Sequence, residues 1–272
     1  MSKGTRALVV LSGGQDSTTC LFWAKKYFNE VHAITFDYNQ RHRRELNAAK
    51  AVGLLANVAT HELVQIGPIL RGRSPLTNPQ EFLEQYQDFD SMDETIGDRV
   101  ELTFVPMRNA LFLTLAANRA ICKDIKTIIT GVCQADNANY PDCRDIFIES
   151  QTNTINLALG IDDFEILAPL MDMSKENSVH LARHLGCYGA LAYSHTSYDG
   201  QYPPVGRDHA TVLRAHGFER AGVPDPLVIR AWSEGFMELP ATANYRDGPA
   251  IEILASNIEA LGLELAGKGF TE

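Results

Sequence analysis

The feature that most constrains how this chain folds is a glycine-rich loop, SGGQDS at residues 12–17, placed between an apolar run and a helical pattern. Residues 6–11 are apolar and rich in β-branched side chains, which is typical of a buried parallel strand. Helical spacing begins at Asp16 and continues to Phe28. Because glycine lets several backbone N–H groups converge at a helix N-terminus, the loop is predicted to hold a phosphate group.

Short apolar runs and helical spacing continue to alternate after this loop. Further strands are expected at 31–36, 58–65 and 126–132, and further helices at about 107–122, 144–159 and 174–185. The alternation predicts an α/β fold with a doubly wound parallel sheet, which binds ligands at the carboxyl ends of its strands. Residues 66–102 have little periodicity and are expected to form a long excursion that folds over a site.

Composition narrows the choice of partners. The formal net charge of −10 and the sequence pI of about 5.3 disfavour sequence-independent binding to nucleic acid or to an anionic membrane, so small molecules and proteins are the expected partners. The N-terminal apolar run of about five residues is too short for a signal sequence or a membrane span, which predicts a cytoplasmic location. The five cysteines are widely spaced without a C-x-x-C pair, and reduced thiols are expected there.

The loop also differs from two common phosphate-binding loops. It lacks the Lys-Ser/Thr ending of a Walker A loop and the spacing of the Rossmann dinucleotide fingerprint. Polar clusters follow later strand or loop ends, as FDYNQRH at 36–42, FVPMRN at 104–109, GVCQAD at 131–136 and YPDCR at 140–144. The first cluster offers an aromatic face to a planar heterocycle. The second places Arg108 near a helix N-terminus, where anionic groups are favoured.

These strings together resemble a known family. SGGQDS resembles the PP-loop of ATP pyrophosphatases, and SGGQDSTTC, TFDYNQRH, FVPMRNALFLTLAA, GVCQADNANYPDCRD and APLMDMSKE together resemble the 7-cyano-7-deazaguanine synthase (QueC) family. The resemblance implies the Rossmann-like fold of adenine-nucleotide α-hydrolases, often as a homodimer. It also implies that ATP adenylates 7-carboxy-7-deazaguanine, that ammonia gives the amide, and that a second ATP converts the amide into the nitrile.

The same resemblance implies roles for particular residues. Asp16, Arg108 and Lys175 are the expected catalytic residues, with Asp16 holding Mg²⁺ through water or orienting the loop and the two cations neutralising phosphate charge. The expected ATP-binding residues are Ser12, Gly13, Gly14, Gln15, Asp16 and Ser17. The expected substrate-binding residues are Phe36, Tyr38, Gln40, Arg41, His42, Arg108, Asn109, Asp136, Tyr140 and Asp142. Phe36 and Tyr38 would stack on the base, while the Asp142 carboxylate would accept two parallel N–H bonds from its guanine-like edge.

Several of these residues have a plain structural alternative. Asp136 at a strand end is also a common cap, and Lys175 could simply lie in a first helical turn. Arg41 and His42 could belong to the solvated start of a helix. These alternatives stay open at the level of sequence.

The chain departs from the family where members usually carry a four-cysteine zinc site. The positions of those cysteines are occupied by Ser197, Val205, Asp208 and Thr211, while flanking residues still match. Zinc is therefore predicted to be absent. A replacement zinc site fits no standard spacing of the nearby candidates His195, Asp208, His209 and His216. Met107 also stands where relatives commonly have glycine, and it is expected to add bulk close to the pocket.

The resemblance divides the chain into a PP-loop domain at 1–190 and a C-terminal segment at 191–272 that replaces the zinc region and adds a tail. From Pro224 onward the tail has two weakly helical stretches separated by residues 240–249. Because a structural metal contributes to folding, its loss requires other support, which the tail is expected to provide.

Several functional alternatives remain open. The amine acceptor could be ammonia or a protein N-terminus, the latter as in QueC-like proteins of antiphage defence, including type IV CBASS. A nonenzymatic protein that only binds ATP or a deazaguanine is a further alternative. A tRNA thiolase would usually need paired cysteines, and a lysidine-type enzyme would need a basic RNA-binding surface; the sequence indicates neither.

Overall fold

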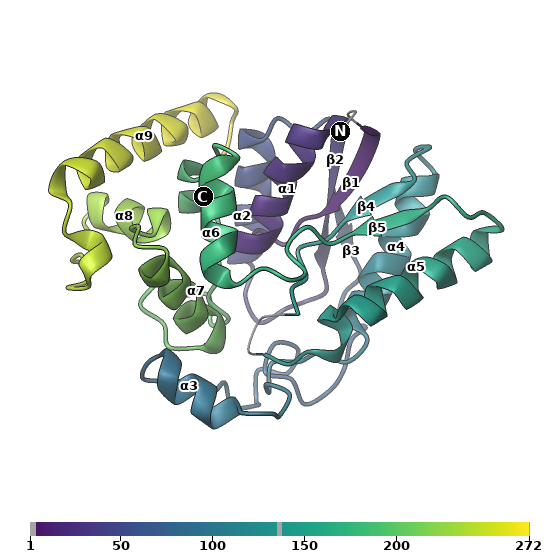
Figure 1. Cartoon of the computed structure of the whole chain (residues 1–272), viewed down its shortest axis with the longest axis horizontal. Coiled ribbons are helices and arrows are strands. Elements are labelled where there is room, and N and C mark those ends of the chain that lie inside the picture. The colour runs from purple at the N-terminus through teal and green to yellow at the C-terminus, as the bar shows by residue number, and fades with distance from the viewer. Residues whose placement is uncertain (1–3, 135–137, 272) are drawn as a thin grey trace.

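The computed structural model describes residues 4–134 and 138–271, and its centre is a five-stranded parallel sheet (Figure 1). The strands are β1 (Gly4–Val10), β2 (Phe28–Asp37), β3 (His61–Gln65), β4 (Thr127–Ile129) and β5 (Glu165–Leu167). Their order across the sheet is β3-β2-β1-β4-β5. Because the chain winds in opposite directions from β1, the loops after β1 and β4 diverge and leave a crevice at the carboxyl ends of the strands. The predicted doubly wound α/β fold is confirmed.

Alternate residues of β1 enter two different cores. Ala7 and Val9 pack with the helices α1 (Gln15–Tyr27) and α2 (Arg44–Leu55) on one face of the sheet. Leu8 packs on the other face with α4 (Arg108–Ile121) and α5 (Asp145–Leu159). Since strand side chains alternate with a period of two, one continuous apolar run supplies both cores, as expected for a buried parallel strand.

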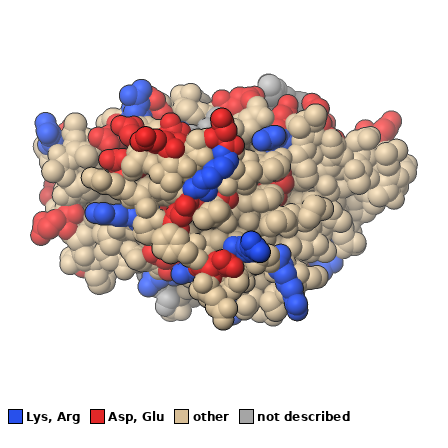
Figure 2. All heavy atoms as spheres, turned by 90° about the horizontal axis from the view of Figure 1, so that it is seen from below, with Lys and Arg blue, Asp and Glu red and all other residues tan. Residues whose placement is uncertain are grey.

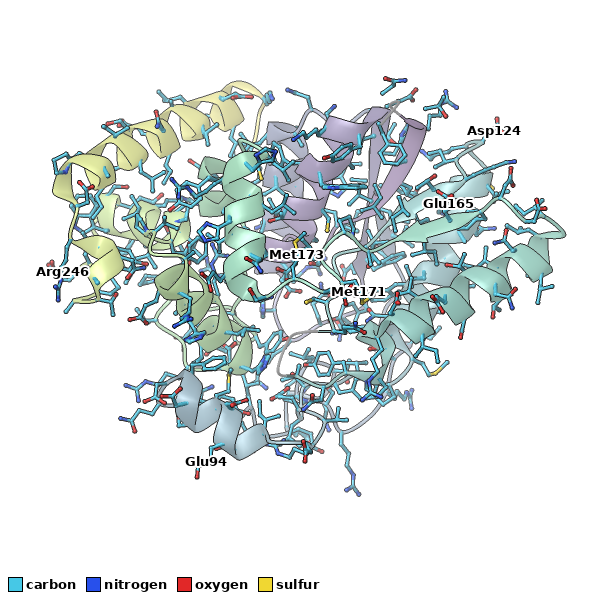
Figure 3. The ribbon with its side chains drawn as sticks, viewed as in Figure 1. Glu94, Asp124, Glu165, Met171, Met173 and Arg246 are labelled. Atoms are coloured by element: carbon cyan, nitrogen blue, oxygen red, sulfur yellow. The ribbon has the colours of Figure 1, made fainter. Side chains whose placement is uncertain are left out.

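The long connection after β3 is an irregular excursion that contains one helix, α3 (Phe89–Ile96). The Asp88 side chain caps α3 by accepting a hydrogen bond from the Ser91 backbone N–H at 2.9 Å. Met92 and Ile96 pack against α7 (His209–Arg220), while Glu94 on the opposite side of α3 points away from the molecule (Figure 3). The excursion therefore rests on the C-terminal part of the chain.

The C-terminal part of the chain adds helices to the α1–α2 face of the sheet. It comprises the short turns η2 (Gly189–Tyr193) and η3 (Ala243–Tyr245) and the helices α7, α8 (Pro226–Ser233) and α9 (Gly248–Gly267). Ile251 and Ile258 of α9 belong to the same core as Ala7 and Val9 of β1. The two helical stretches predicted after Pro224 are α8 and α9, whereas the division of the chain at residue 190 stays a prediction.

Some boundaries and elements differ from the expectation. The predicted first helix ends one residue earlier, at Tyr27, because β2 begins directly at Phe28. The strands expected at 58–65 and 126–132 are shorter than predicted, and α2, α3, α7 and β5 were not predicted. β5 has three residues, too few to show a period, and α7 buries polar Thr211 and Arg214 beside apolar side chains, which hides its helical periodicity.

The surface carries charges of both signs. On the face shown in Figure 2, Lys and Arg side chains are scattered among Asp and Glu side chains. None of the helices within residues 4–134 and 138–271 is both long enough and apolar enough to span a membrane.

Candidate active site

The glycine-rich loop at residues 12–17 runs from the end of β1 into α1 at the crevice in the sheet. The Ser12 and Ser17 hydroxyls are 3.0 Å apart, and they also accept hydrogen bonds from the Gly14 and Gly13 backbone N–H groups at 3.3 and 3.2 Å. The Gln15 side-chain amide donates a hydrogen bond to Ser178 of α6 (Lys175–His184) at 3.3 Å, which ties the loop to that helix. The loop is thus held in shape by its own side chains.

Gly13 is required by the way α2 packs on this loop. Its φ is +88°, and a Cβ at this position would lie 2.4 Å from the Glu45 carbonyl oxygen and 2.5 Å from the Ala49 backbone nitrogen. Both contacts are with backbone atoms of α2, which cannot move aside independently. The start of α2 is therefore fixed directly against the glycine-rich loop.

Lys175 and Asp16 form an ion pair at the edge of the loop. Lys175 is the first residue of α6, whose N-cap is Ser174, and its Nζ lies 2.8 Å from Asp16 Oδ2. The segment that leads from β5 into α6 carries Met171 and Met173, which lie near the centre of the molecule in Figure 3. Lys175 thus lies in a first helical turn, as the structural alternative supposed, and it also reaches the glycine-rich loop.

Arg108 begins α4 and points toward aromatic side chains. Its guanidinium lies beside the hydroxyl of Tyr38, and Tyr140, Tyr198 and Asp142 also act on it electrostatically. Burial by itself would lower the Arg108 pKa, but these neighbours raise it overall, so the guanidinium stays charged. A half-buried permanent cation that lines the same cavity as the loop suits an anionic ligand.

Met107, the residue before α4, does not have the effect expected from the sequence. It has a φ of 65° and is the N-cap of α4, but its side chain is 68% exposed and does not line the cavity. The prediction that it adds bulk close to the pocket is wrong, because the left-handed backbone turns the side chain toward solvent.

The aromatic residues after β2 meet α4. The Phe36 ring stacks on Phe112 at a centroid distance of 4.5 Å, and the Tyr38 ring is tilted against Phe112 at 5.3 Å. Gln40 accepts a hydrogen bond from the Tyr38 backbone N–H at 3.1 Å, which holds the turn after the strand. Part of the aromatic surface expected to stack on a substrate is therefore used inside the protein.

Arg41 and His42 lie just before α2, between the excursion and the C-terminal part of the chain. The Arg41 backbone N–H donates to the Leu76 carbonyl at 2.9 Å. The His42 ring packs edge-on against His195, with centroids 5.0 Å apart. Both residues are half-buried and line the cavity, so they do not belong to a fully solvated helix start.

Asp142 is buried beside the start of α4 and does not line the cavity described below. Its carboxylate accepts a hydrogen bond from the Asn109 backbone N–H at 3.2 Å, in the first turn of α4, and the Asn109 side chain donates to the Asp142 carbonyl at 3.1 Å. Burial raises its pKa while Arg108 opposes the rise. Neighbouring Tyr140 bonds to Thr103 and lies 3.3 Å from Glu101, a buried acid that the sequence interpretation missed.

A cavity of about 320 Å³ joins these groups at the carboxyl end of the sheet. Its lining includes every proposed site residue in the described part of the chain except Gly13 and Asp142; Asp136 lies outside the described residues. The lining residues that were not predicted include the polar and charged side chains Glu45, Thr196, Tyr198, His209 and Arg214. They come from α2 and the C-terminal part, where the sequence shows no motif beyond the residue types themselves.

The four residues predicted to replace zinc-binding cysteines partly converge. The Asp208 carboxylate accepts hydrogen bonds from the Ser197 and Thr211 hydroxyls, both at 3.0 Å, and from the Thr211 backbone N–H at 3.1 Å. Val205 takes no part, since its side chain is 57% exposed. His216 instead stacks on Phe89 of α3. Among the residues whose placement is described, no group of three His, Cys, Asp or Glu side chains could hold a metal ion.

Comparison with known proteins identifies the family. The family model described as "Queuosine biosynthesis protein QueC" matches residues 6–222. The chain belongs to the QueC family. A 7-cyano-7-deazaguanine synthase from Gloeobacter violaceus is 47% identical over 82% of this chain and 95% of its own length. One from Laribacter hongkongensis is 46% identical over 82% of this chain and 94% of its own length.

Solved structures are similar to this QueC family member only at the level of the fold. NMN synthetase from Francisella tularensis matches 96% of this chain and 87% of its own chain, with 13% identity and a TM-score of 0.41. NH3-dependent NAD synthetase from Campylobacter jejuni matches 97% and 88%, with 14% identity and a TM-score of 0.39. A likeness at this level says nothing about the substrate.

Proposed function

We propose that this protein uses ATP to adenylate the carboxylate of 7-carboxy-7-deazaguanine and then transfers the acyl group to an amine, releasing AMP and pyrophosphate. The observation that carries the proposal is that one cavity joins the phosphate loop and Lys175 to the aromatic and cationic groups Phe36, Tyr38 and Arg108. This cavity can therefore bind a polyphosphate and a planar anionic heterocycle next to each other. The name of the relatives, 7-cyano-7-deazaguanine synthase, supports this substrate class.

The chemistry needs activation because a carboxylate is a poor electrophile. A carboxylate oxygen attacks the α-phosphate of ATP, the bond to the β-phosphate oxygen breaks, and pyrophosphate leaves. The amine nitrogen then attacks the acyl carbon, and AMP leaves with the oxygen that was activated. The protein has to align the first two groups, neutralise phosphate charge and keep water away from the adenylate.

The loop residues and two nearby cations would bind the negatively charged phosphates of ATP. Backbone N–H groups of residues 12–17 and the N-terminus of α1 would hold the pyrophosphate half, and Lys175 and Arg108 would neutralise charge on either side of the α-phosphate. Mg²⁺ bound to a nucleotide usually needs only one or two protein carboxylates, because phosphate oxygens and water complete its shell. Asp16 fits such a carboxylate, since it lies at the loop and faces the cavity.

The C-terminal segment predicted to replace the zinc region forms one wall of the cavity, and this wall affects which amine can accept the acyl group. Thr196, Tyr198, His209, Ala210 and Leu213 all line the cavity. A change of this wall can admit an amine larger than ammonia, which favours a protein N-terminal amine as the second candidate acceptor. A secondary amide formed in that way cannot be dehydrated to a nitrile, so the two candidates give different products.

Mass spectrometry of the products tests the proposal. The purified protein is incubated with Mg-ATP, 7-carboxy-7-deazaguanine and ammonium, and pyrophosphate is measured in parallel. A free nitrile would support the synthase, whereas adenylate or primary amide alone would support another acceptor. An absence of pyrophosphate release would contradict the proposal and favour a protein that only binds its ligands, and release that does not depend on 7-carboxy-7-deazaguanine would contradict the proposed substrate. Light scattering of the same sample tests the homodimer that the family resemblance implies.

A further inference from the structure

Glu45 is a carboxyl group of the cavity that neither the phosphate loop nor the aromatic cluster accounts for. It lies in the first turn of α2, and its side chain lines the cavity. The close contact between its carbonyl oxygen and Gly13 fixes its backbone against the phosphate loop. The backbone that carries this carboxyl is therefore fixed next to the glycine-rich loop.

The surroundings of Glu45 come from three other parts of the chain. Arg108 at the start of α4 attracts its carboxylate, Asp208 at the start of α7 repels it, and Tyr38 after β2 also interacts with it. Over residues 4–134 and 138–271, no hydrogen bond or ion pair within 4 Å engages the Glu45 carboxyl. A half-buried carboxyl without a protein partner is open to a ligand.

The other carboxyl groups at or beside the cavity already have partners within the protein. Asp16 is bonded to Lys175, and Asp208 accepts from Ser197 and Thr211. His209 lines the cavity, and its ring nitrogens have no hydrogen-bond partner within the described residues. Burial together with Lys175 lowers its pKa to about 4, which makes it a weaker base than Glu45. Glu45 is therefore the acid of this cavity that is best placed to exchange a proton with a bound molecule.

We infer that Glu45 is the general base of the acyl-transfer step and accepts the proton that the attacking amine must lose. This inference rests on the proposed function. As the amine nitrogen forms its bond to the acyl carbon, the bond from that carbon to the AMP oxygen breaks, and one N–H proton moves to the Glu45 carboxylate. Glu45 later releases this proton to solvent. The first step, attack of the substrate carboxylate on ATP, needs no such base because the carboxylate is already deprotonated.

The electrostatics agree with this role. Burial raises the pKa of Glu45 to about 7, against the attraction of Arg108, and Asp208 adds to the rise. A base is most effective when its pKa lies close to the working pH, since it is then both available and strong enough. An ordinary surface glutamate, whose pKa is near 4.5, would be a much weaker base.

Separating the two half-reactions tests the inference. Enzyme at a concentration above that of radiolabelled 7-carboxy-7-deazaguanine is mixed with Mg-ATP without amine, and adenylate formation is followed by rapid quench. Ammonium is then added, and amide formation is timed across pH 6 to 9. Glu45→Gln keeps the shape of the side chain but cannot accept the proton. Glu62→Gln, an exposed acid on β3 paired with Arg119, serves as the matched control.

For Glu45→Gln we expect adenylate formation within about 3-fold of the unchanged protein and amide formation slower by about 10²- to 10⁴-fold, the usual range for a lost general base. The variant should also lose the rise in rate with pH that the base contributes near pH 7.

Equal loss in both half-reactions would overturn the inference and point to binding of ATP or Mg²⁺, and an unchanged amide step would also overturn it. If the unchanged protein forms no adenylate, the proposed function itself fails. Circular dichroism of the variant checks that it is folded.

Discussion

Lys175 Nζ lies 2.8 Å from Asp16 Oδ2, so an ion pair joins the start of α6 to the phosphate loop across 159 positions of sequence. The pair is partly shielded, with side-chain exposures of 10% and 25%. Gly217 of α7 lies so close that a Cβ there would be 2.5 Å from Lys175 Cγ. Three separate segments therefore fix where this ammonium points.

Replacing Lys175 tests its assignment to the phosphate site. Lys175→Met removes the charge but keeps much of the side-chain volume, and we expect pyrophosphate release to fall by about 10²-fold or more, because a fixed cation stabilises the charge that develops on the phosphates. Lys126→Met, on an exposed lysine paired with Asp163, should leave the rate unchanged. A similar rate for both variants would remove Lys175 from the catalytic residues.

Gly13 should tolerate no side chain. Gly13→Ala combines a positive φ with contacts of 2.4 and 2.5 Å to the backbone of α2, and we expect it to lower the free energy of unfolding by at least ~2–3 kcal/mol or to move α2 off the loop. Gly160→Ala is the matched control, because its φ of +68° is also positive but nothing lies within 4 Å of the added Cβ, and it should cost only about 1 kcal/mol. Urea unfolding monitored by fluorescence compares the two, and equal costs would contradict the packing argument.

The buried ion pair of Arg214 and Asp225 should hold the C-terminal part together. Arg214 donates to both Asp225 carboxylate oxygens at 2.6 and 2.8 Å, and it also bonds to Ser194 and Thr196, next to the cavity. Arg214→Met leaves the Asp225 carboxylate buried without its cation, so we expect a loss of about 3–5 kcal/mol in the free energy of unfolding. The double change Arg214→Met, Asp225→Leu should cost clearly less than Arg214→Met alone; calorimetry that gives the opposite order would argue against the pair as the cause.

Zinc should be absent from the purified protein. Ser197, Asp208 and Thr211 form a hydrogen-bonded cluster at three of the family's cysteine positions, and the fourth, Val205, cannot coordinate a metal. Elemental analysis should therefore find well under one zinc per chain, and treatment with EDTA should not change the melting temperature. Asp208→Ala should lower stability by roughly 2 kcal/mol, because it removes a helix cap and two hydroxyl partners. Zinc at one equivalent per chain would refute this prediction.

Stability should depend on pH through Glu45. Its pKa is raised from 4.5 to about 7 in the folded protein, so the folded state holds a proton between these values that the unfolded state has lost. The contribution of Glu45 to stability is therefore complete below about pH 4.5 and is lost as the pH rises through 7. Urea unfolding at pH 5 and pH 8 should show Glu45→Gln gaining roughly 1–3 kcal/mol relative to the unchanged protein at the higher pH. A pH-independent difference would contradict this assignment.

The sequence by itself determined the fold class and the turn between β1 and α1, because both depend on signals that are local in the chain. Apolar β-branched runs specify buried parallel strands, and SGGQDS between residues 6–11 and the first helix specifies a turn at a helix N-terminus. The family was recognised from five sequence motifs and from their order along the chain. Roles beyond these, including that of Asp136 outside the described residues, stay predictions.

Only the tertiary structure decided which groups share the cavity. Glu45, Tyr198 and His209 reach it from segments that carry no motif, and Asp142 is turned toward α4 instead. The hydrogen bonds of Asp208 and the ion pair of Arg214 likewise depend on how α7 packs against the segment before it. Contacts between residues far apart in the chain are selected by packing and burial, which leave no period or spacing in the sequence.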